Sequence, residues 1–261
     1  MRFAQSLVLL CAIGMAAAQA RAENEFSVGV EGFRDTYKEP GVSVDTHTEY
    51  KSVTASDQYN FDNYFVGIQG RYSEGSADYK SVSGALDHIP ELESDLRLLG
   101  GLNYVLWHGH LMPYTGVGWR YYFDQGKGLQ TNTGALAYDR HISQVYIPIG
   151  ATYKFNWGGF DFAPMAEFDA LANGYVSTHL APTGVDKNIV NIQTKGFGWR
   201  GEFMTGQQYK YFGWEVGPFV RYWNIQDSSC KVTRVTQPLD ECRLEPANTR
   251  LQYGAAFRLN F

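Results

Sequence analysis

Hydrophobic and polar residues alternate with a period of two along most of the chain. In the segment 144–155, one face carries Val145, Ile147 and Ile149, whereas the other carries polar residues such as Gln144 and Lys154. This period is typical of a β-strand whose two faces meet different surroundings. The same alternation recurs in the segments 111–124, 212–223 and 251–261.

The alternating segments predict ten strands. The expected strands are 24–36, 41–55, 61–76, 92–106, 111–124, 142–156, 159–175, 191–206, 210–226 and 249–261. The second segment has the weakest pattern, and without it eight strands and one long loop remain. We see no linker and no repeat beyond the hairpin, so the strands are expected to form one domain.

The connections between these segments alternate in length. Short connections are expected at 56–60, 107–110, 157–158 and 207–209, and longer ones at 77–91, 125–141, 176–190 and 227–248. Bacterial membrane barrels have an even number of strands, short periplasmic turns and longer external loops. The first connection, 37–40, is the exception because it is short. Both ends of the mature chain are then expected on the periplasmic side.

The two faces of these strands differ in the way that a membrane barrel requires. The apolar face is rich in aromatic residues near the strand ends, as in an interfacial girdle, and the polar face places charges beside glycines. Unpaired backbone groups cost several kcal/mol each in lipid, so such strands must close on themselves. We therefore predict an all-β protein, a closed antiparallel up-and-down transmembrane β-barrel. The alternative is a secreted β-sandwich or a soluble barrel, which would bury one apolar face of each sheet.

Composition narrows the class further. Aromatic residues make up 15% of the 261 residues and charged residues only 19%, which excludes a disordered chain. The formal net charge of -5 argues against a nucleic-acid partner, because phosphates would be repelled. Mean hydropathy is -0.32. After the N-terminus no apolar run reaches the roughly 18 residues of a transmembrane helix.

The N-terminus has the pattern of an export signal. Arg2 precedes an apolar stretch at 6–18, and the sequence Ala20-Arg21-Ala22 provides a cleavage site. The expected division is a signal peptide at 1–22 and a barrel domain at 23–261. A retained N-terminal anchor helix and a lipoprotein modified at Cys11 are the alternatives.

Two cysteines remain after cleavage, Cys230 and Cys242. Cysteines of an exported chain are expected to be oxidised, so we predict one disulfide bond between them. It would lie in the longest expected loop, 226–247, and closing that loop would add about 3 kcal/mol of stability. Such a bridge would protect the loop from proteolysis or hold it ready to bind an extracellular ligand.

The last strand resembles the terminal signature of outer-membrane β-barrel proteins of Gram-negative bacteria. It ends at Phe261 and carries Tyr253 and Phe257 on the same face. The resemblance implies a location in the outer membrane, contact with its lipid and lipopolysaccharide, and insertion by the barrel-assembly machinery, which reads the terminal residues. The segments 84–101 and 218–228 are similar to outer-membrane proteins of unassigned activity.

The polar face predicts a lumen with nearly balanced charge. Its expected acidic residues are Glu31, Asp45, Glu49, Asp95, Asp161, Glu167, Asp169, Glu202 and Glu215. Its expected basic residues are Lys51, Arg71, Arg97, Arg120, Lys154, Arg200, Arg221 and Arg258. Opposite charges in so narrow a lumen should pair, because an isolated buried charge is costly. We expect a plug of ion pairs. The alternative is a narrow channel for small solutes, which would more naturally carry an excess of one sign.

Candidate catalytic groups are few. The segment Asp139-Arg140-His141 resembles the Asp-x-His of omptin-type outer-membrane proteases, which are ten-stranded barrels, but no partnering Asp-x-Asp is found. Ser143 shares a face with His141, as in an outer-membrane esterase, yet no orienting acid follows.

Metal and cofactor sites are equally poorly supported. His108 and His110 share a short turn, but no third metal ligand is nearby. We therefore expect no enzyme, no cofactor and no metal site. The expected role is structural, or an interaction at the cell surface.

Overall fold

The computed structural model describes residues 24–61, 63–184, 188–233 and 241–261. The signal peptide predicted at 1–22 lies outside the described residues. Among the described residues, no helix has the length and apolar character needed to cross a bilayer. Two short 3-10 turns occur, η1 at Pro40–Val42 and η2 at Ala181–Thr183.

Ten long strands run around the described part of the molecule in sequence order. They are β1 (Asn24–Glu39), β2 (Val44–Phe61), β3 (Tyr64–Ser81), β4 (Gly84–Leu102), β6 (Gly109–Gln125), β7 (Asp139–Trp157), β8 (Phe160–Thr178), β10 (Gly196–Gln208), β11 (Gly213–Ile225) and β14 (Asn248–Asn260). The short strand β5 (Tyr104–Leu106) follows β4, and β9 (Ile189–Gln193) precedes β10. A separate hairpin, β12 (Lys231–Thr233) with β13 (Glu241–Arg243), stands in the last loop.

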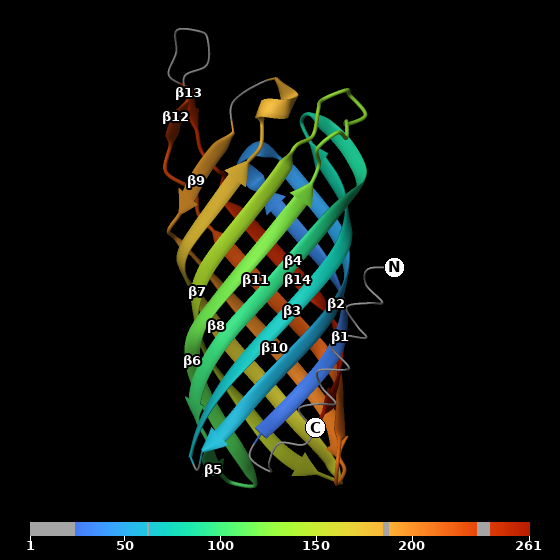
Figure 1. Ribbon diagram of the computed structural model, residues 1–261, viewed down its shortest axis with the longest axis vertical. Helices are drawn as coiled ribbons and strands as arrows, with labels where there is room; N and C mark the ends of the chain where they lie inside the picture. The colour runs from blue at the N-terminus through green and yellow to red at the C-terminus, as the bar shows by residue number, and fades with distance from the viewer. Residues whose placement is uncertain (1–23, 62, 185–187, 234–240) are drawn as a thin grey trace.

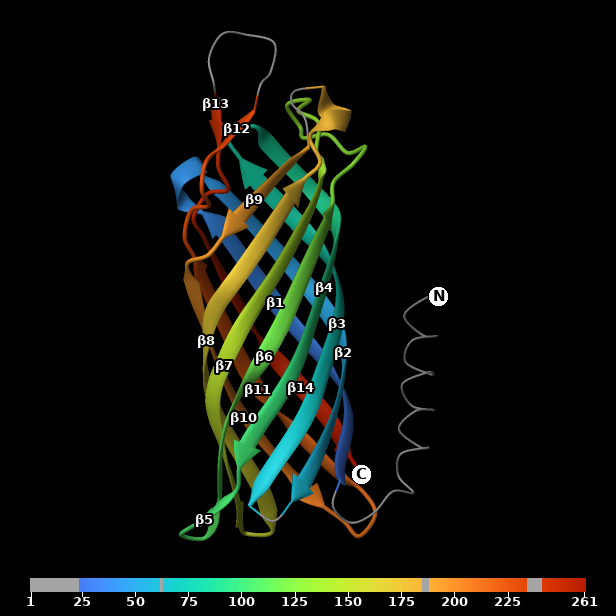
Figure 2. The ribbon, with the colours of Figure 1, turned by 60° about the vertical axis from the view of Figure 1, so that its left-hand side comes forward.

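The strands close into a barrel. Each long strand pairs antiparallel with its neighbour along the chain, and β14 pairs back onto β1, where Phe257 lies opposite Val30. The tilted strands form a tall cylinder with the C-terminus and β5 at one end and the loop hairpin at the other (Figures 1 and 2). Closure leaves no unpaired edge among the ten long strands of the described chain. The predicted ten-stranded barrel is confirmed, including the weakly patterned second strand.

The strands are longer than their alternation indicated. β3 and β4 continue to a tight turn at 82–83, so the long loop expected at 77–91 is wrong. Pairs such as Lys80 with Ala85 extend the ladder there. Far from the apolar belt both faces of a strand meet water or polar groups. The period-two hydropathy signal therefore fades although the backbone still pairs. The turn expected at 56–60 is wrong as well, because β2 runs on to Phe61.

The apolar face points outward. Val145, Ile147 and Ile149 are 36%, 45% and 56% exposed, whereas their neighbours Gln144 and Tyr146 are buried inside the barrel. Exposed aromatic residues gather toward the end of the barrel that carries the C-terminus: Tyr64, Trp107, Trp157, Phe160, Tyr211, Phe212 and Phe261. This is the inverse of a soluble protein, in which such side chains would be covered.

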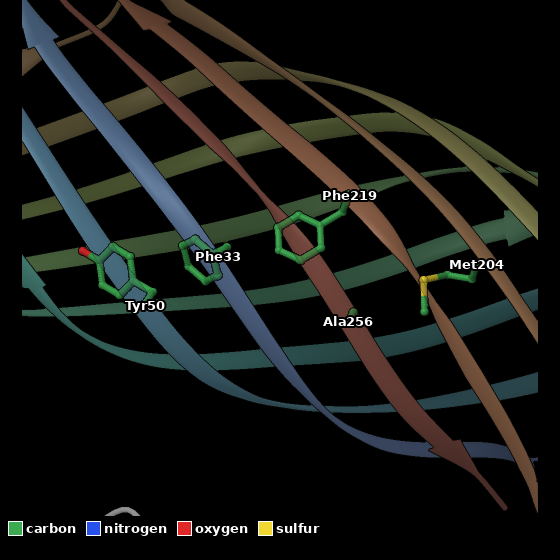
Figure 3. Packing of buried hydrophobic residues seen from close by; sticks show 5 residues of the cluster. All are labelled: Phe33, Tyr50, Met204, Phe219 and Ala256. Atoms are coloured by element: carbon green, nitrogen blue, oxygen red, sulfur yellow. The ribbon is translucent and has the colours of Figure 1, made fainter.

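The interior holds small apolar clusters among polar groups. Phe33, Tyr50, Met204, Phe219 and Ala256 form the cluster in Figure 3, contributed by five neighbouring strands. The rings of Phe33 and Tyr50 stack with centroids 4.9 Å apart. No large hydrophobic core forms in the described part of the chain, because the inward face of every long strand also carries polar groups.

Inward glycines make room for large inward rings. A Cβ on Gly198 would lie 2.7 Å from the indole of Trp223, so only glycine allows this ring to cross the neighbouring strand. Gly118 stands in the same relation to the ring of Tyr146. The glycines of the polar face therefore follow from the packing of the lumen.

One strand faces the opposite way from the prediction. Asp45, Glu49 and Lys51 point outward on β2, and Thr48 and Tyr50 are buried in the lumen. The exposed Glu49 pairs with Arg34 of β1 at 3.3 Å on the outer surface. Both faces of this part of β2 are polar, and the bulkier, less charged side chains fill the interior.

A charge placed in the middle of the outward belt should destabilise the barrel. We expect Ile149→Arg to lower the free energy of unfolding by about 2–4 kcal/mol, because arginine would enter hydrocarbon near the midplane. His47→Arg, on the exposed outer face of β2 among charged side chains, is the matched control and should change it little. Urea unfolding of barrels folded in lipid vesicles measures both. Equal effects of the two substitutions would mean that no hydrocarbon surrounds Ile149.

Candidate functional site

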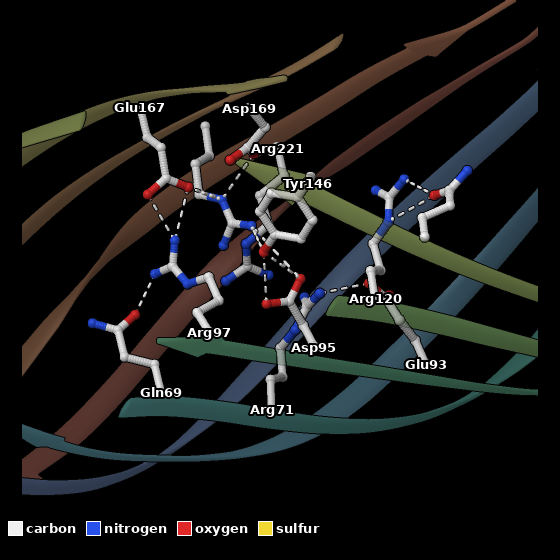
Figure 4. A network of polar contacts seen from close by, with 12 residues as sticks. Gln69, Arg71, Glu93, Asp95, Arg97, Arg120, Tyr146, Glu167, Asp169 and Arg221 are labelled. Atoms are coloured by element: carbon white, nitrogen blue, oxygen red, sulfur yellow. Dashed lines mark hydrogen bonds and ion pairs between the residues drawn. The ribbon is translucent and has the colours of Figure 1, made fainter. Parts of the chain in front are cut away.

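The middle of the lumen is crossed by a network of buried charges centred on Arg200 of β10. Its Nε lies 2.6 Å from Glu167 and 3.4 Å from Asp169, both on the adjacent strand β8. Its Nη2 lies 3.6 Å from Asp95 of β4, on the far side of the lumen. Tyr146 completes the centre: its hydroxyl accepts from Arg200 at 2.9 Å and donates to Asp95 at 3.0 Å (Figure 4).

Arg97 of β4 extends this network across the barrel. Its Nη1 donates to both oxygens of Glu167 at 2.7 Å, and its Nη2 donates to the side-chain oxygen of Gln69. Tyr114 also donates to Glu167, at 2.7 Å. Glu167 is thus held by two guanidinium groups and one hydroxyl, which together offset the cost of burying its charge.

A second group of ion pairs surrounds Glu31 of β1. Arg221 donates to both oxygens of Glu31, at 3.0 and 2.8 Å, and Arg71 approaches the same carboxylate at 3.7 Å. Arg71 also pairs with Glu93, which accepts from Gln252 at 2.8 Å. These bonds join β1 to β11 and β3, and β4 to β3 and β14.

The remaining predicted lumen residues lie around these two groups. Arg258 pairs with Glu202 at 2.7 Å. Arg120 instead donates to the side-chain oxygen of Gln144, and its guanidinium lies 3.8 Å from the ring centroid of Trp223. Lys154 is at the lower rim, which is the end of the barrel that carries the C-terminus. There it pairs with Glu25 at 2.7 Å, and both side chains are partly exposed. Glu215 and Asp161 line the space below the network.

A third group, nearer the loop end, was not anticipated. Arg250 of β14 lies 3.3 Å from Asp35 of β1 and stacks 3.8 Å from the ring centroid of Tyr122. Arg250 and Asp35 could have been identified from the sequence. Each is an even number of positions from a predicted lumen residue on its own strand, Arg258 and Glu31 respectively, and therefore faces inward as well.

The other charged members of this third group lie in segments that the sequence predicted to be loops. Glu91 accepts from Thr48 and Tyr50, both at 2.7 Å. Arg140 pairs with Glu39 at 3.1 Å and with Glu245 from the stem of the last loop. Glu91 and Arg140 belong to the strand extensions, where hydropathy alternation is lost.

Below these groups the barrel is hollow. A cavity of about 890 Å³ extends from the Arg97 and Arg221 groups down to residues of the lower rim such as His108, Lys154 and Phe261. This cavity, called the vestibule below, opens at the end that carries the C-terminus and is lined at its inner end by the charged groups.

The candidate catalytic residues lie on the outer surface near the loop end. His141 stacks on Phe123 with ring centroids 4.2 Å apart, and its Nδ1 lies 2.6 Å from the hydroxyl of Tyr121. Asp139 accepts from the backbone of Lys127 at 3.0 Å. Ser143 accepts from the indole of Trp119 at 2.9 Å.

The histidines of the lower turn are placed apart from any metal-binding arrangement. His110 is hydrogen-bonded to Asn103 at 2.9 Å. In the described part of the chain no group of three or more His, Cys, Asp or Glu side chains is arranged to hold a metal ion.

The structure also places the two predicted cysteines and the aromatic residues of the last strand. Cys230 directly precedes β12, and Cys242 pairs with Val232 within the hairpin. The side chain of Cys242 lies outside what the structure describes, so the disulfide stays a prediction. Tyr253, Phe257 and Phe261 point outward and are 48%, 40% and 38% exposed.

Comparison with known proteins finds only distant likenesses, all among solved structures. No protein-family model and no curated protein matches the chain. Among solved structures it is similar to the translocator domain of the autotransporter NalP from Neisseria meningitidis, at 8% identity and a TM-score of 0.47, covering 100% of this chain and 95% of that one. The transport unit of the autotransporter AIDA-I from Escherichia coli is 10% identical, with a TM-score of 0.46, and the match covers 96% of each chain. The toluene transporter TodX from Pseudomonas putida is 11% identical, with a TM-score of 0.36, and the match covers 93% of this chain and 90% of that one.

The chain has the fold of an outer-membrane β-barrel. Its apolar outward face, closed ladder and polar interior are the features that define this fold. The likenesses to solved structures are too distant to assign a function.

Removing the central arginine should be strongly destabilising. We expect Arg200→Met to lower the free energy of unfolding by about 3–5 kcal/mol, because Asp95, Glu167 and Asp169 would lose a buried partner. Arg34→Met breaks an exposed pair on the outer surface and should cost less than about 1 kcal/mol. Urea unfolding in lipid vesicles compares the two. A loss below 1 kcal/mol for Arg200→Met would show that water enters the network freely.

Proposed function

We propose that this protein is an integral, non-conducting barrel of a Gram-negative outer membrane with a structural or surface-interaction role and no catalytic activity. It is exported by its signal peptide, which is cleaved after Ala22, and inserted by the barrel-assembly machinery through Tyr253, Phe257 and Phe261. Its outward belt then contacts lipid and lipopolysaccharide.

The observation that supports a closed lumen is the stack of three charged groups above the vestibule. Arg200 and Arg221 are each only 6% exposed, and Arg200 reaches Asp95 of β4 on the far side of the lumen. A permeating ion would have to shed water and separate these buried pairs, which costs several kcal/mol for each charge left alone. The acidic and basic residues of the network are also nearly balanced, unlike a pore that selects ions by an excess of one sign.

Ordered loops at the opposite end support an interaction role. The loop at 126–138 is tied to the β3–β4 hairpin, where Thr131 donates to the carbonyl of Ser83 and Asn132 to that of Ala85, both at 2.9 Å. The stem of the last loop is fixed in a similar way, because Ser228 accepts from the backbone of Glu245 at 2.8 Å and from Asn191 at 2.9 Å. Such preorganised loops lose little entropy on binding an extracellular ligand. A disulfide between Cys230 and Cys242 would strengthen this preorganisation.

A narrow channel for small solutes is the second candidate. The vestibule favours it, because the lower half of the lumen is already hollow and only the upper part must open. The two candidates differ in whether the charged groups separate under a voltage.

Electrical recording tests the choice directly. We expect the purified barrel to give no steady current steps in a planar bilayer, because the charged groups remain paired across the lumen. A general porin treated identically is the positive control, and heat-modifiable migration on gels shows that the barrel is folded. Reproducible open steps that scale with salt concentration would overturn the non-conducting proposal and support the channel.

A further inference from the structure

Four charged side chains stand close together on the outer face of β1, β2 and β3. In the sheet register Arg34 of β1 is paired with Glu49 of β2, and Lys51 of β2 with Glu74 of β3. All four are exposed and point away from the lumen. Arg34 and Glu49 form an ion pair at 3.3 Å, but their side chains are 68% and 78% exposed. Such an exposed pair leaves both groups free to bind a partner as well.

The four charges alternate in sign around the barrel. The strands lean toward β1 as they rise toward the loop end, and Glu49 is nearer that end of β2 than Lys51 (Figure 1). Glu49 therefore lies on the side of β1, where it meets Arg34, and Lys51 lies on the side of β3, beside Glu74. From β1 to β3 the order is Arg34, Glu49, Lys51 and Glu74, which we call the charged row.

The charged row is complementary to itself. A two-fold axis along the membrane normal, passing through β2, turns a second copy so that its row runs in the opposite direction. Arg34 then faces Glu74 of the second copy, and Lys51 faces its Glu49. Every charge meets one of opposite sign, and each contact occurs twice. A uniformly acidic or basic partner would instead face two like charges, so the order of the row favours a second copy of this chain.

The charged row is flanked by lipid-facing side chains. Arg34 is paired with Tyr253 of β14, which is 48% exposed on the outer surface, and Glu74 is paired with Leu92 of β4. The apolar belt thus stops lower on β1, β2 and β3 than on the strands beside them. Charges at the boundary of the hydrocarbon are costly unless they are paired, and a locally short belt favours association.

Below the charged row this face is shallow. Between Phe26 and Arg34 the outward residues of β1 are Val28, Val30 and Gly32. A Cβ on Gly32 would meet nothing within 4 Å, so the backbone there is open to the outside. Without a large ring in the way, a second barrel wall can approach closely enough for the charges above to meet.

From these observations we propose that two copies of this barrel associate side by side in the membrane. The contact is formed by the outer faces of β1, β2 and β3, and the charged row sets its orientation. This inference goes beyond the proposed function and holds whether or not the lumen conducts.

Energy transfer between labelled barrels tests the association. Mature chains carrying a donor or an acceptor dye at the N-terminus are folded together into phosphatidylcholine vesicles at a series of protein-to-lipid ratios. We expect transfer that rises with protein density and saturates as a two-copy equilibrium. Transfer no greater than random proximity gives would overturn the proposal and leave this face to lipopolysaccharide or a different membrane protein.

Charge reversals in separate molecules test the assigned contacts. Arg34→Glu places acidic groups opposite each other at both ends of the charged row, and Glu74→Arg places basic groups there. We expect each variant alone to associate at least about tenfold more weakly. An equal mixture of the two should associate about as well as the unaltered chain, because opposite charges meet again. Undiminished association of either variant alone, or no recovery in the mixture, would refute the contact.

Two further variants control for general effects of charge. Lys195→Glu reverses an exposed charge next to β10, on the other side of the barrel, and should associate like the unaltered chain. Asp78→Arg lies on β3, four residues nearer the loop end than Glu74, and should restore association with Arg34→Glu much less than Glu74→Arg does. Heat-modifiable migration shows that each variant is folded. Equal recovery with Asp78→Arg would contradict the pairing of Arg34 with Glu74.

Discussion

The rest of the structure depends on one constraint: a backbone surrounded by lipid must satisfy its own hydrogen bonds. The chain meets it by pairing each long strand with two neighbours and joining β14 to β1. Closure then divides every strand into an outward and an inward face. Aromatic and aliphatic residues occupy the first, and the second encloses a space too narrow to leave charges independent of one another.

The interior shows how such charges are accommodated. Glu167 and Glu31 are each held by two arginines, and hydroxyl and amide groups of Tyr146, Gln144 and Gln252 complete the bonds. Breaking one pair would leave a buried charge without a partner, so the groups reinforce one another across the barrel. A network of this kind holds opposite walls of the cylinder together, a role that a hydrophobic core has in a soluble protein.

The distribution of these groups along the axis separates two regions. Near the loops, Arg140 and Arg250 gather acidic partners from strands and from the last loop, so the wall and its surface loops form one bonded unit. Toward the other end the lumen widens into the vestibule, which acidic and basic side chains line together.

The sequence by itself determined the barrel class, the strand number and the face of most residues, because alternation reports directly on a wall with lipid on one side and polar groups on the other. It could not determine where strands end beyond the apolar belt, as at 77–91, or the orientation of β2, since both faces are polar there. Only the tertiary structure decided which charges meet. Arg200 reaches Asp95 on a strand several positions away, and that encounter depends on strand tilt and stagger, which no local pattern encodes.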